Sequence, residues 1–402
     1  MVSERFPRVR ELRANALGWR IASVYGALFF GIGVSLPFLP VWLKARGLGV
    51  EQIALVLAVQ SIMRVVASPL MSHVADRLGR LRPVMTGCAM AALTGLLWLA
   101  GARGFAAILL GVIAAYAAFA PLMPLTEAYA VSAVKHMAGL DYGRMRLWGS
   151  LAFIAGNLVA GASLDVMEAG NLIWLIVAAQ AALVGALMLL PPRGAHEEAR
   201  ARAPGQGTDG HSFLSAAFII FVLAAGLTQG SHALVYGFSA LHWKALGHSG
   251  AVTGMLWATG VLAEVVLFWF SGMVMARLGA VRLLMLGAGA AVIRWLGLSL
   301  DPPLVLLFAF QALHGLSFGA SHLGAIEYIK SRVAPERMAT AQAIYGAVAG
   351  GVFMTGSMWA SGKLFRAYGA HAWWFMAAMA GLAFMLALVL RRISPRAPER
   401  AD

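Results

Sequence analysis

Long apolar runs separated by short polar breaks fill almost the whole chain. A transmembrane helix needs about 20 mainly apolar residues, and twelve such runs follow one another. The first run is too long for a signal-peptide core and no small-residue cleavage site follows it, so we interpret it as a retained span. The pattern predicts an all-α integral membrane protein with spans near 17–43, 51–75, 83–101, 104–134, 146–166, 171–190, 213–242, 251–275, 282–300, 304–330, 339–362 and 372–390.

The longest polar break, 191–212, divides the spans into six and six. Its proline, glycine and charged residues are typical of a flexible linker. The second half repeats the first at an offset near 200 residues: SHVADRLGRLR at Ser72–Arg82 lies over GMVMARLGAVR at Gly272–Arg282. Duplicated six-helix halves are typical of secondary transporters, whose substrate site lies at the midplane. We therefore predict a six-helix bundle in 1–190, a cytoplasmic linker in 191–212, a pseudo-symmetric bundle in 213–391 and a cytoplasmic tail in 392–402.

The charge distribution indicates how the chain lies in a membrane. Only 12% of the residues are charged, against about 25% in soluble domains, which excludes an ordinary soluble enzyme. Of the Lys and Arg residues, 23 lie in breaks on the side of the N-terminus and 6 in breaks on the other side. Positively charged loops favour the cytoplasmic side of a membrane. We therefore expect a protein of the inner membrane with both termini in the cytoplasm. The same bias accounts for the net charge of +14 without a nucleic-acid partner.

Motifs for catalysis, metals and nucleotides do not occur in the sequence. The single cysteine, Cys88, matches no zinc spacing, and neither a Walker A sequence nor HExxH is present. We therefore predict that the protein is not an enzyme, has no catalytic residues, and uses no cofactor and no metal. An ion gradient is then the expected energy source.

The break between the second and third spans carries a recognisable motif. It resembles the loop signature of the major facilitator superfamily, G-x-x-x-D-R-x-G-R-R, through Asp76, Arg77, Gly79 and Arg80. The resemblance implies the twelve-helix fold of that superfamily and a gating role for the loop. Asp76 is able to accept hydrogen bonds from neighbouring arginines or from a helix N-terminus. The alternative interpretation is that these charges only set the topology.

Six further segments narrow the resemblance to the phenylpropionate permease branch, which is related to proton-coupled lactose and nucleoside permeases. It implies symport with protons, a substrate-site pair Glu127 and Arg146, and coupling residues Arg294 and His314. Ser317 replaces a carboxylate of the lactose-permease pattern, and Glu264 lies about one turn beyond its eighth-span acid. The segments are PLMPLTEA (Pro121–Ala128), LDYGRMRLWGS (Leu140–Ser150), GFSALHWK (Gly237–Lys244), VLAEVVLF (Val261–Phe268), IRW (Ile293–Trp295) and LHG (Leu313–Gly315).

Ionisable side chains inside the spans are the main candidates for chemistry. Each costs at least about 2.5 kcal/mol to insert, so it needs a partner, a wet cavity or a function. Glu264 is the predicted proton carrier, because its charge depends on whether Arg294 or a substrate lies alongside. The alternative is a permanent ion pair between Glu264 and Arg294. His314 either shares the proton or is hydrogen-bonded in the packing.

Substrate recognition has two candidate arginines. Arg64 and Arg146 each offer the bidentate geometry that binds a carboxylate, although Arg146 is also explained as a positive-inside charge. Stacking and polar contacts are assigned to Trp148, Gln229, His232 and Tyr236, each of which has packing as its alternative role.

Together these features predict a monomeric secondary transporter in membrane lipid. We expect proton-coupled symport of a small organic anion, such as an aromatic carboxylate, by alternating access. The alternatives are symport of a sugar or nucleoside with protons, antiport of a drug or metabolite against protons, and a sensor that has lost transport.

Overall fold

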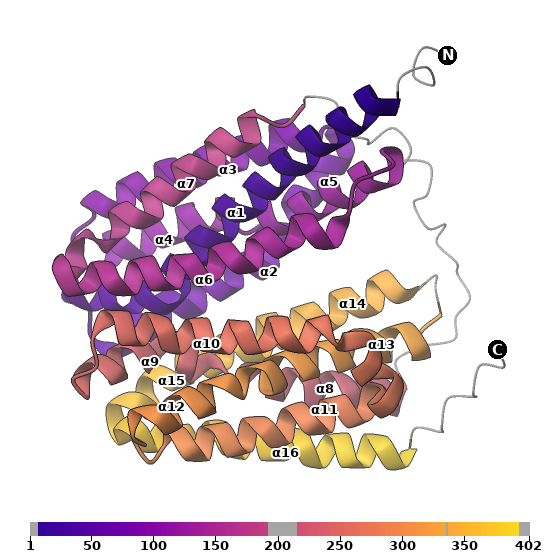
Figure 1. The fold of residues 1–402 in the computed structure, drawn as a ribbon. Helices are drawn as coiled ribbons and strands as arrows, with labels where there is room; N and C mark the ends of the chain where they lie inside the picture. Colours follow the sequence, from indigo (N-terminus) through magenta and orange to yellow (C-terminus); the bar gives the residue numbers. More distant parts are fainter. Residues whose placement is uncertain (1–6, 192–214, 335–336, 394–402) are drawn as a thin grey trace. The chain divides into compact units, whose positions relative to one another are not determined.

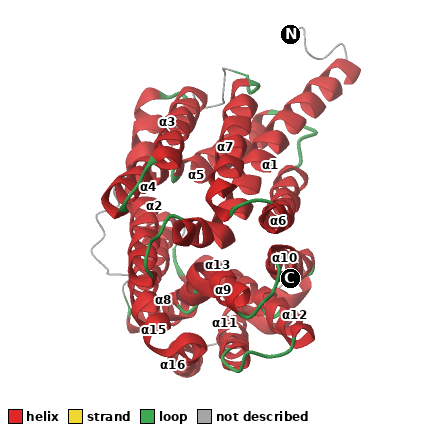
Figure 2. Ribbon diagram, turned by 90° about the vertical axis from the view of Figure 1, so that its left-hand side faces the viewer, coloured by secondary structure: helices red, strands yellow, loops and turns green. Residues whose placement is uncertain are grey.

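The computed structural model describes residues 7–191, 215–334 and 337–393. Within these ranges every regular element is a helix, and no strand occurs (Figures 1 and 2). The first-half helices are α1 (Pro7–Ala45), α2 (Val50–Leu78), α3 (Leu81–Gly101), α4 (Phe105–Phe119), α5 (Leu122–His136), α6 (Tyr142–Val166), η1 (Ala169–Asn171) and α7 (Leu172–Met188). The second-half helices are α8 (Ala216–Gly230), α9 (Ala233–Ala245), α10 (Gly250–Trp269), α11 (Ser271–Leu298), α12 (Leu304–Ala312), η3 (Gly315–Ala320), α13 (Ser321–Arg332), α14 (Met338–Gly346), η5 (Ala347–Phe353), α15 (Met354–Tyr368), η6 (Gly369–Ala372) and α16 (Trp373–Ile393).

Eleven stretches of the described residues are long and apolar enough to cross a membrane. The last of them, Met338–Ile393, has 56 residues, more than twice the about 20 residues that one crossing needs. It contains two helical rods separated by the short turn η6. The prediction of an all-α, twelve-span membrane protein is therefore confirmed. The predicted linker beyond Pro191 and the tail from 394 lie outside the described residues.

Several predicted spans are not continuous α-helices. The run 104–134 is divided into α4 and α5 at Ala120 and Pro121, because Pro121 and Pro124 have no backbone N–H to continue the helix. The run 213–242 is divided at Ser231 and His232. The run 304–330 contains the π-helical turn η3, a form that is rare in proteins and frequent at functional sites.

The chain forms two compact units. The first unit comprises 1–48, 62–205 and 248–255, and the second comprises 49–61, 206–247 and 256–402. The start of α2 thus packs with the second unit and the start of α10 with the first. These two helix starts, 49–61 and 248–255, lie about 200 residues apart, which is the offset of the sequence repeat.

The repeat is also visible in the backbone at two pairs of glycines. Gly47 and Gly247 have φ of 86° and 87°, and Gly79 and Gly279 have φ of 62° and 70°. Residues with a Cβ rarely adopt this left-handed conformation. Both copies of the repeat therefore keep glycine at corresponding positions, although Gly79 directly follows α2 whereas Gly279 lies at a kink inside α11.

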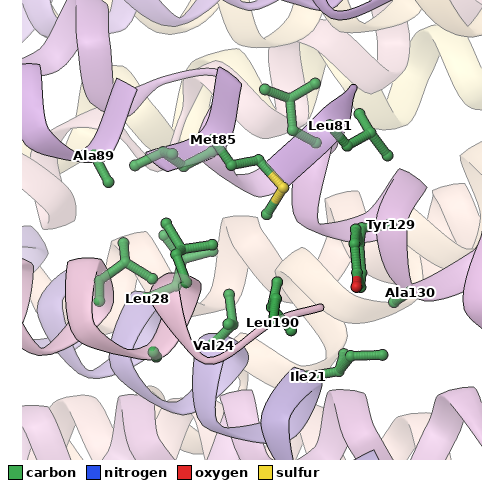
Figure 3. Packing of buried hydrophobic residues seen from close by; sticks show 14 of the residues in the cluster. Ile21, Val24, Leu28, Leu81, Met85, Ala89, Tyr129, Ala130 and Leu190 are labelled. Carbon is green, nitrogen blue, oxygen red and sulfur yellow. The ribbon is translucent and has the colours of Figure 1, made fainter. Parts of the chain in front are cut away.

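Each unit has its own apolar core. In the first unit, Val24 and Leu28 of α1 belong to one buried cluster with Met85 and Ala89 of α3 (Figure 3). In the second unit, Phe221 of α8 stacks on Tyr328 of α13 with ring centroids 4.3 Å apart. These cores hold the helices that carry the polar residues described next.

Candidate functional site

Arg294 of α11 lies at the centre of a polar cluster inside the second unit. The residue is only 2% exposed. Its Nη1 donates to Nδ1 of His314 at 3.0 Å and to Oγ of Ser317 at 3.2 Å, and its Nη2 donates to Oε1 of Gln311. The guanidinium also lies 4.7 Å from the ring centroid of Trp295. A buried cation is thus surrounded by polar groups that carry no negative charge.

The contact with Arg294 fixes the protonation of the His314 ring. A guanidinium only donates hydrogen bonds, so Nδ1 of His314 must accept and cannot carry a proton. In the neutral ring the proton then lies on Nε2, which is 3.8 Å from Oε2 of Glu264. The two nitrogens of His314 therefore face Arg294 and Glu264 on opposite sides of the ring, the second at a separation longer than a hydrogen bond. Whether His314 shares the proton or only packs there stays a prediction.

His232 extends the cluster from the break between α8 and α9. Its Nδ1 lies 2.9 Å from the carbonyl oxygen of Thr228 and must donate to it, which leaves Nε2 as an acceptor. Oγ of Ser317 lies 3.2 Å from this Nε2. Ser317 therefore donates to His232 and accepts from Arg294, so each polar group has a defined direction.

Local sequence explains why the helix breaks at His232. In a regular helix the Thr228 carbonyl would accept the backbone N–H four residues later. Here the Ser231 hydroxyl and the His232 ring bind that carbonyl instead, at 2.7 and 2.9 Å. Side-chain bonds of this kind compete with the helix backbone. Ser231 Oγ also accepts from the indole nitrogen of Trp295 at 3.0 Å, which ties the break to α11.

Glycines bring Glu264 of α10 close to His314. A Cβ on Gly315 would lie 2.7 Å from the carbonyl oxygen of Ala263, and one on Gly260 would lie 3.1 Å from Cβ of His314. The close approach of α10 to η3 therefore depends on these two residues having no side chain. The π-helical turn then presents His314 and Ser317 to Arg294.

The remaining predicted residues of the second unit line the same region. The Tyr236 ring lies 5.8 Å from His232 and 5.9 Å from Trp257, measured between centroids. Gln229 is buried and interacts with Tyr345. These aromatic contacts make His232 and Tyr236 part of one packed wall.

A second polar group lies in the first unit, where α5 and α6 supply Glu127 and Arg146. Nε of Arg146 lies 3.9 Å from Oε1 of Glu127, with the two side chains 28% and 39% exposed. The guanidinium lies over the rings of Phe29, at 4.1 Å, and Tyr25, at 5.7 Å. The two residues that the family resemblance paired are therefore neighbours, with an aromatic platform from α1 beneath them.

The other predicted residues of the first unit are more scattered. Trp148 is exposed, and its ring centroid lies 5.4 Å from that of Trp19. Arg64, also exposed, acts electrostatically on the hydroxyl of Tyr116.

The loop motif forms a tight turn between α2 and α3. Asp76 and Arg77 lie in the last turn of α2, Gly79 has the left-handed conformation, and Arg80 precedes α3 as its N-cap residue. Asp76 is exposed and has no hydrogen bond or ion pair within the described ranges. Its role as a charged latch stays a prediction.

Several residues of both clusters were not assigned from sequence. Gln311 precedes His314 by three residues, which places both on one helical face, and this spacing was a usable signal. The sequence singles out Ser317 only because it replaces a carboxylate of the lactose-permease pattern. Tyr25 and Phe29 lie four residues apart on α1, the spacing of neighbours on a helix surface, but nothing local distinguishes them from core aromatics.

Comparisons with known proteins agree on one family. The model of the "MFS_1 like family" matches residues 18–377. The "Probable 3-phenylpropionic acid transporter" of Escherichia coli K12 is 33% identical over 364 residues, covering 90% of this chain and 94% of the relative. The "Maltose permease" of Geobacillus stearothermophilus is 30% identical over 343 residues, covering 82% of each chain.

Solved structures agree with this family on the fold. The crystal structure of the nucleoside transporter NupG superimposes with a TM-score of 0.77 at 19% sequence identity, covering 94% of this chain and 98% of that one. At this identity the likeness supports the twelve-helix fold.

Proposed function

The chain belongs to the MFS_1 like family of the major facilitator superfamily, and from that premise we propose that this multi-pass secondary transporter takes up a small organic anion with protons by alternating access. The substrate class we propose is an aromatic carboxylate of the phenylpropionate kind, because the 33% identical relative is named for such a substrate. The observation that carries the proton coupling is the bridge from Arg294 through His314 to Glu264.

Through His314, the protonation state of Glu264 changes the electrostatic environment of Arg294. The guanidinium donates to Nδ1 of the imidazole, and the opposite ring nitrogen lies 3.8 Å from the carboxylate, longer than a hydrogen bond but within electrostatic reach. A charged Glu264 is the natural end of such a chain, because it supplies the negative charge that a buried arginine requires. Protonation of Glu264 removes that charge and leaves Arg294 in need of another anion. A substrate carboxylate is an anion of the required kind.

The same geometry favours Glu264 over His314 as the proton carrier. A doubly protonated imidazole has two donors and no acceptor. Its Nδ1–H would then face the N–H of Arg294, which lies 3.0 Å away. Protonation of His314 therefore requires Arg294 to move, whereas protonation of Glu264 does not.

For the substrate carboxylate, the first unit offers an exchangeable partner. Arg146 faces Glu127 at the long distance of 3.9 Å and is partly exposed. A bidentate pair with a substrate carboxylate would be shorter and better aligned. Arg64 is the competing ligand, and both remain in the proposed set with Trp148, Gln229, His232 and Tyr236.

A second candidate function is proton-coupled uptake of a sugar, which the 30% identity to a maltose permease favours. The two functions differ in the charge of the substrate. Competition of labelled 3-phenylpropionate uptake by unlabelled maltose and unlabelled phenylalkanoates separates them, because only the true substrate class inhibits at comparable concentration.

We also propose that the protein works as a monomer in the cytoplasmic membrane with both termini inside the cell. The bias of 23 basic residues against 6 supports this orientation. A reporter active only in the cytoplasm, fused after Asp402, is expected to be active. A reporter active only in the periplasm at the same position should be silent, and activity there would overturn the topology.

The decisive test of coupling is Glu264→Gln, which imitates the protonated carboxyl. We expect the variant to exchange labelled 3-phenylpropionate across proteoliposome membranes but not to accumulate it under a proton gradient. Glu127→Gln is the matched control in the first unit and should keep gradient-driven accumulation, with altered affinity only. Normal accumulation by Glu264→Gln would show that Glu264 does not carry the proton.

A further inference from the structure

The start of α10 is held by a carboxylate from another helix of the first unit. Asp165 lies in the last turn of α6. Its two oxygens accept the backbone N–H groups of Gly250, at 2.6 Å, and of Ala251, at 2.9 Å. The first N–H groups of a helix have no partner inside that helix, and the helix dipole favours negative charge there. Both oxygens of Asp165 therefore form charge-assisted bonds to α10.

Small residues bring the two helices together at this point. A Cβ on Gly161 of α6 would overlap the carbonyl oxygen of Gly250, and a Cβ on Gly254 of α10 would overlap that of Asn157. Asp165 follows Gly161 by four residues, so both lie on the same face of α6. A tight helix contact therefore places the Asp165 carboxylate at the N-terminus of α10.

The other copy of the repeat has a charged contact at the corresponding place. Arg366 in the last turn of α15 lies 3.1 Å from Oε1 of Glu51 in the first turn of α2, and both residues belong to the second unit. Arg366 and Glu51 follow and precede Asp165 and Ala251 by about 200 residues, the offset of the repeat. This ion pair is exposed, so it contributes little. Both copies thus join the same pair of helix ends, although the residues differ.

The position of α10 in the chain gives this contact a consequence for transport. Residues 248–255 pack with the first unit, whereas the helix from 256 onwards packs with the second. In alternating access the two halves of such a transporter separate on one side of the membrane at a time. The break before α10 carries Lys244, one of the six basic residues on the side expected to face outward. When that side opens, α10 has to leave α6 and the bonds of Asp165 have to break.

We propose that Asp165 is a latch that keeps the outer side of the transporter closed by binding the N-terminus of α10. The proposal rests on the proposed function, which supplies alternating access and the orientation of the chain. Loss of the latch increases the population that is open to the outside, while the polar clusters around Arg294 and Arg146 stay unchanged. The competing interpretation is an ordinary helix cap, which stabilises α10 equally in every state.

Two spin labels on the outer side measure the latch directly. In a Cys88→Ser background, Arg103→Cys and Ala367→Cys place one label at an exposed position of each unit. In the purified full-length protein we expect Asp165→Asn to raise the ratio of long to short distances between the labels by about tenfold. An effect of this size follows from the loss of hydrogen bonds to a charged group.

Two control variants separate a latch from a helix cap. Ser249 caps the same N-terminus, because its Oγ accepts the N–H of Val252 at 3.2 Å. Ser249→Ala therefore weakens the start of α10 without changing Asp165. Glu168→Gln removes an equal charge three residues after Asp165, and Glu168 forms no side-chain cap on the described turn that follows it. Both controls should keep the wild-type distances, with a lower thermal midpoint for Ser249→Ala.

The outcomes distinguish this inference from the proposed function. If Asp165→Asn keeps the wild-type distances, or if Ser249→Ala changes them as much, Asp165 is only a helix cap and the latch is overturned. A larger change in Glu51→Gln than in Asp165→Asn also overturns it, because the main latch would then lie in the second unit. The distances are measured without substrate, so a wild type that transports no 3-phenylpropionate contradicts the proposed substrate and leaves this test decisive.

Discussion

The two units of the chain each place an arginine among aromatic side chains, but they treat the charge in opposite ways. Arg294 in the second unit is buried and bonded to three uncharged side chains in fixed directions. Arg146 in the first unit is partly exposed, faces a carboxylate at 3.9 Å and lies over Phe29. A buried cation whose Nη1 and Nη2 are bonded in fixed directions responds to a change of charge nearby, whereas a loosely paired one is able to change partner. The first arrangement suits proton coupling and the second suits substrate exchange.

The backbone differs in the same way. The second-unit network depends on a helix break at His232 and on the π-helical turn η3, which contains Ser317. In the first unit, Arg146 and Phe29 lie within the continuous helices α6 and α1. Irregular backbone at membrane depth is tolerated where it is buried in protein or lines a water-filled cavity. The hydrogen-bond network around Arg294 therefore depends on irregular backbone, whereas the contact of Arg146 with Phe29 does not.

The largest expected effect comes from removing the two arginines. Arg294→Ala leaves acceptors on His314, Ser317 and Gln311 without their donor in a buried site, and each such unsatisfied group costs about 1 to 3 kcal/mol. We expect a sharply lower thermal midpoint and no gradient-driven uptake. Arg146→Ala should fold nearly as stably as wild type, because its ion pair is partly exposed and such pairs contribute at most about 1 kcal/mol.

Thermal unfolding of both variants in one detergent measures this difference. Equal losses of stability would show that the two arginines are held alike, and the contrast between the units would fail. Arg294→Lys serves as a second control, since it keeps the charge but cannot form the same set of directed bonds.

A smaller effect is expected from changing only His314, which lies between Arg294 and Glu264. His314→Gln keeps an acceptor for Arg294 but is too short to reach Glu264 in the same way. Uptake of 3-phenylpropionate should then lose its dependence on the proton gradient while exchange continues. Unchanged accumulation in this variant would separate His314 from coupling and leave Glu264 to act through another route.

The sequence predicted much of this fold for a simple physical reason. Membrane spans are set by length and apolarity, so residue types alone predict them. A positive φ at paired turns requires glycine, so the pairing of Gly47 with Gly247 is also predictable from the sequence. The helix breaks were less accessible. Pro121 marked one of them, but the break at His232 depends on side chains of Ser231 and His232 that bind one carbonyl.

The sites were predictable to a different degree. Ionisable residues within apolar runs are costly, so Arg294, His314 and Glu264 drew attention from sequence alone. The order in which they contact each other depends on how closely α10 approaches η3, which is set by the absence of side chains at Gly260 and Gly315.

A moderate effect is expected from disturbing the first-unit platform. A Cβ on Gly149 would lie 2.9 Å from the Phe29 ring and 3.0 Å from Nη1 of Arg146. Gly149→Val should therefore displace the guanidinium from its ring and raise the KM for uptake several-fold, without loss of proton coupling. Gly170→Val is the control, because a Cβ there meets no neighbouring atom. Loss of coupling in Gly149→Val would mean that the two units do not divide the work as proposed.

The smallest expected effect distinguishes two serines one turn apart in the second unit. Ser317 and Ser321 are both buried, but Ser317 bonds to His232 and Arg294, whereas the Ser321 hydroxyl has no hydrogen-bond partner in the described part of the chain. Ser317→Ala leaves those two groups each with one bond fewer, at a cost of about 1 to 3 kcal/mol. Ser321→Ala removes an unsatisfied hydroxyl and should be neutral or slightly stabilising. Chemical denaturation of the two variants beside wild type measures the difference. Equal stabilities would show that the directed chain through Ser317 adds nothing to the fixed network, and the contrast between the two arginines would then rest on burial alone.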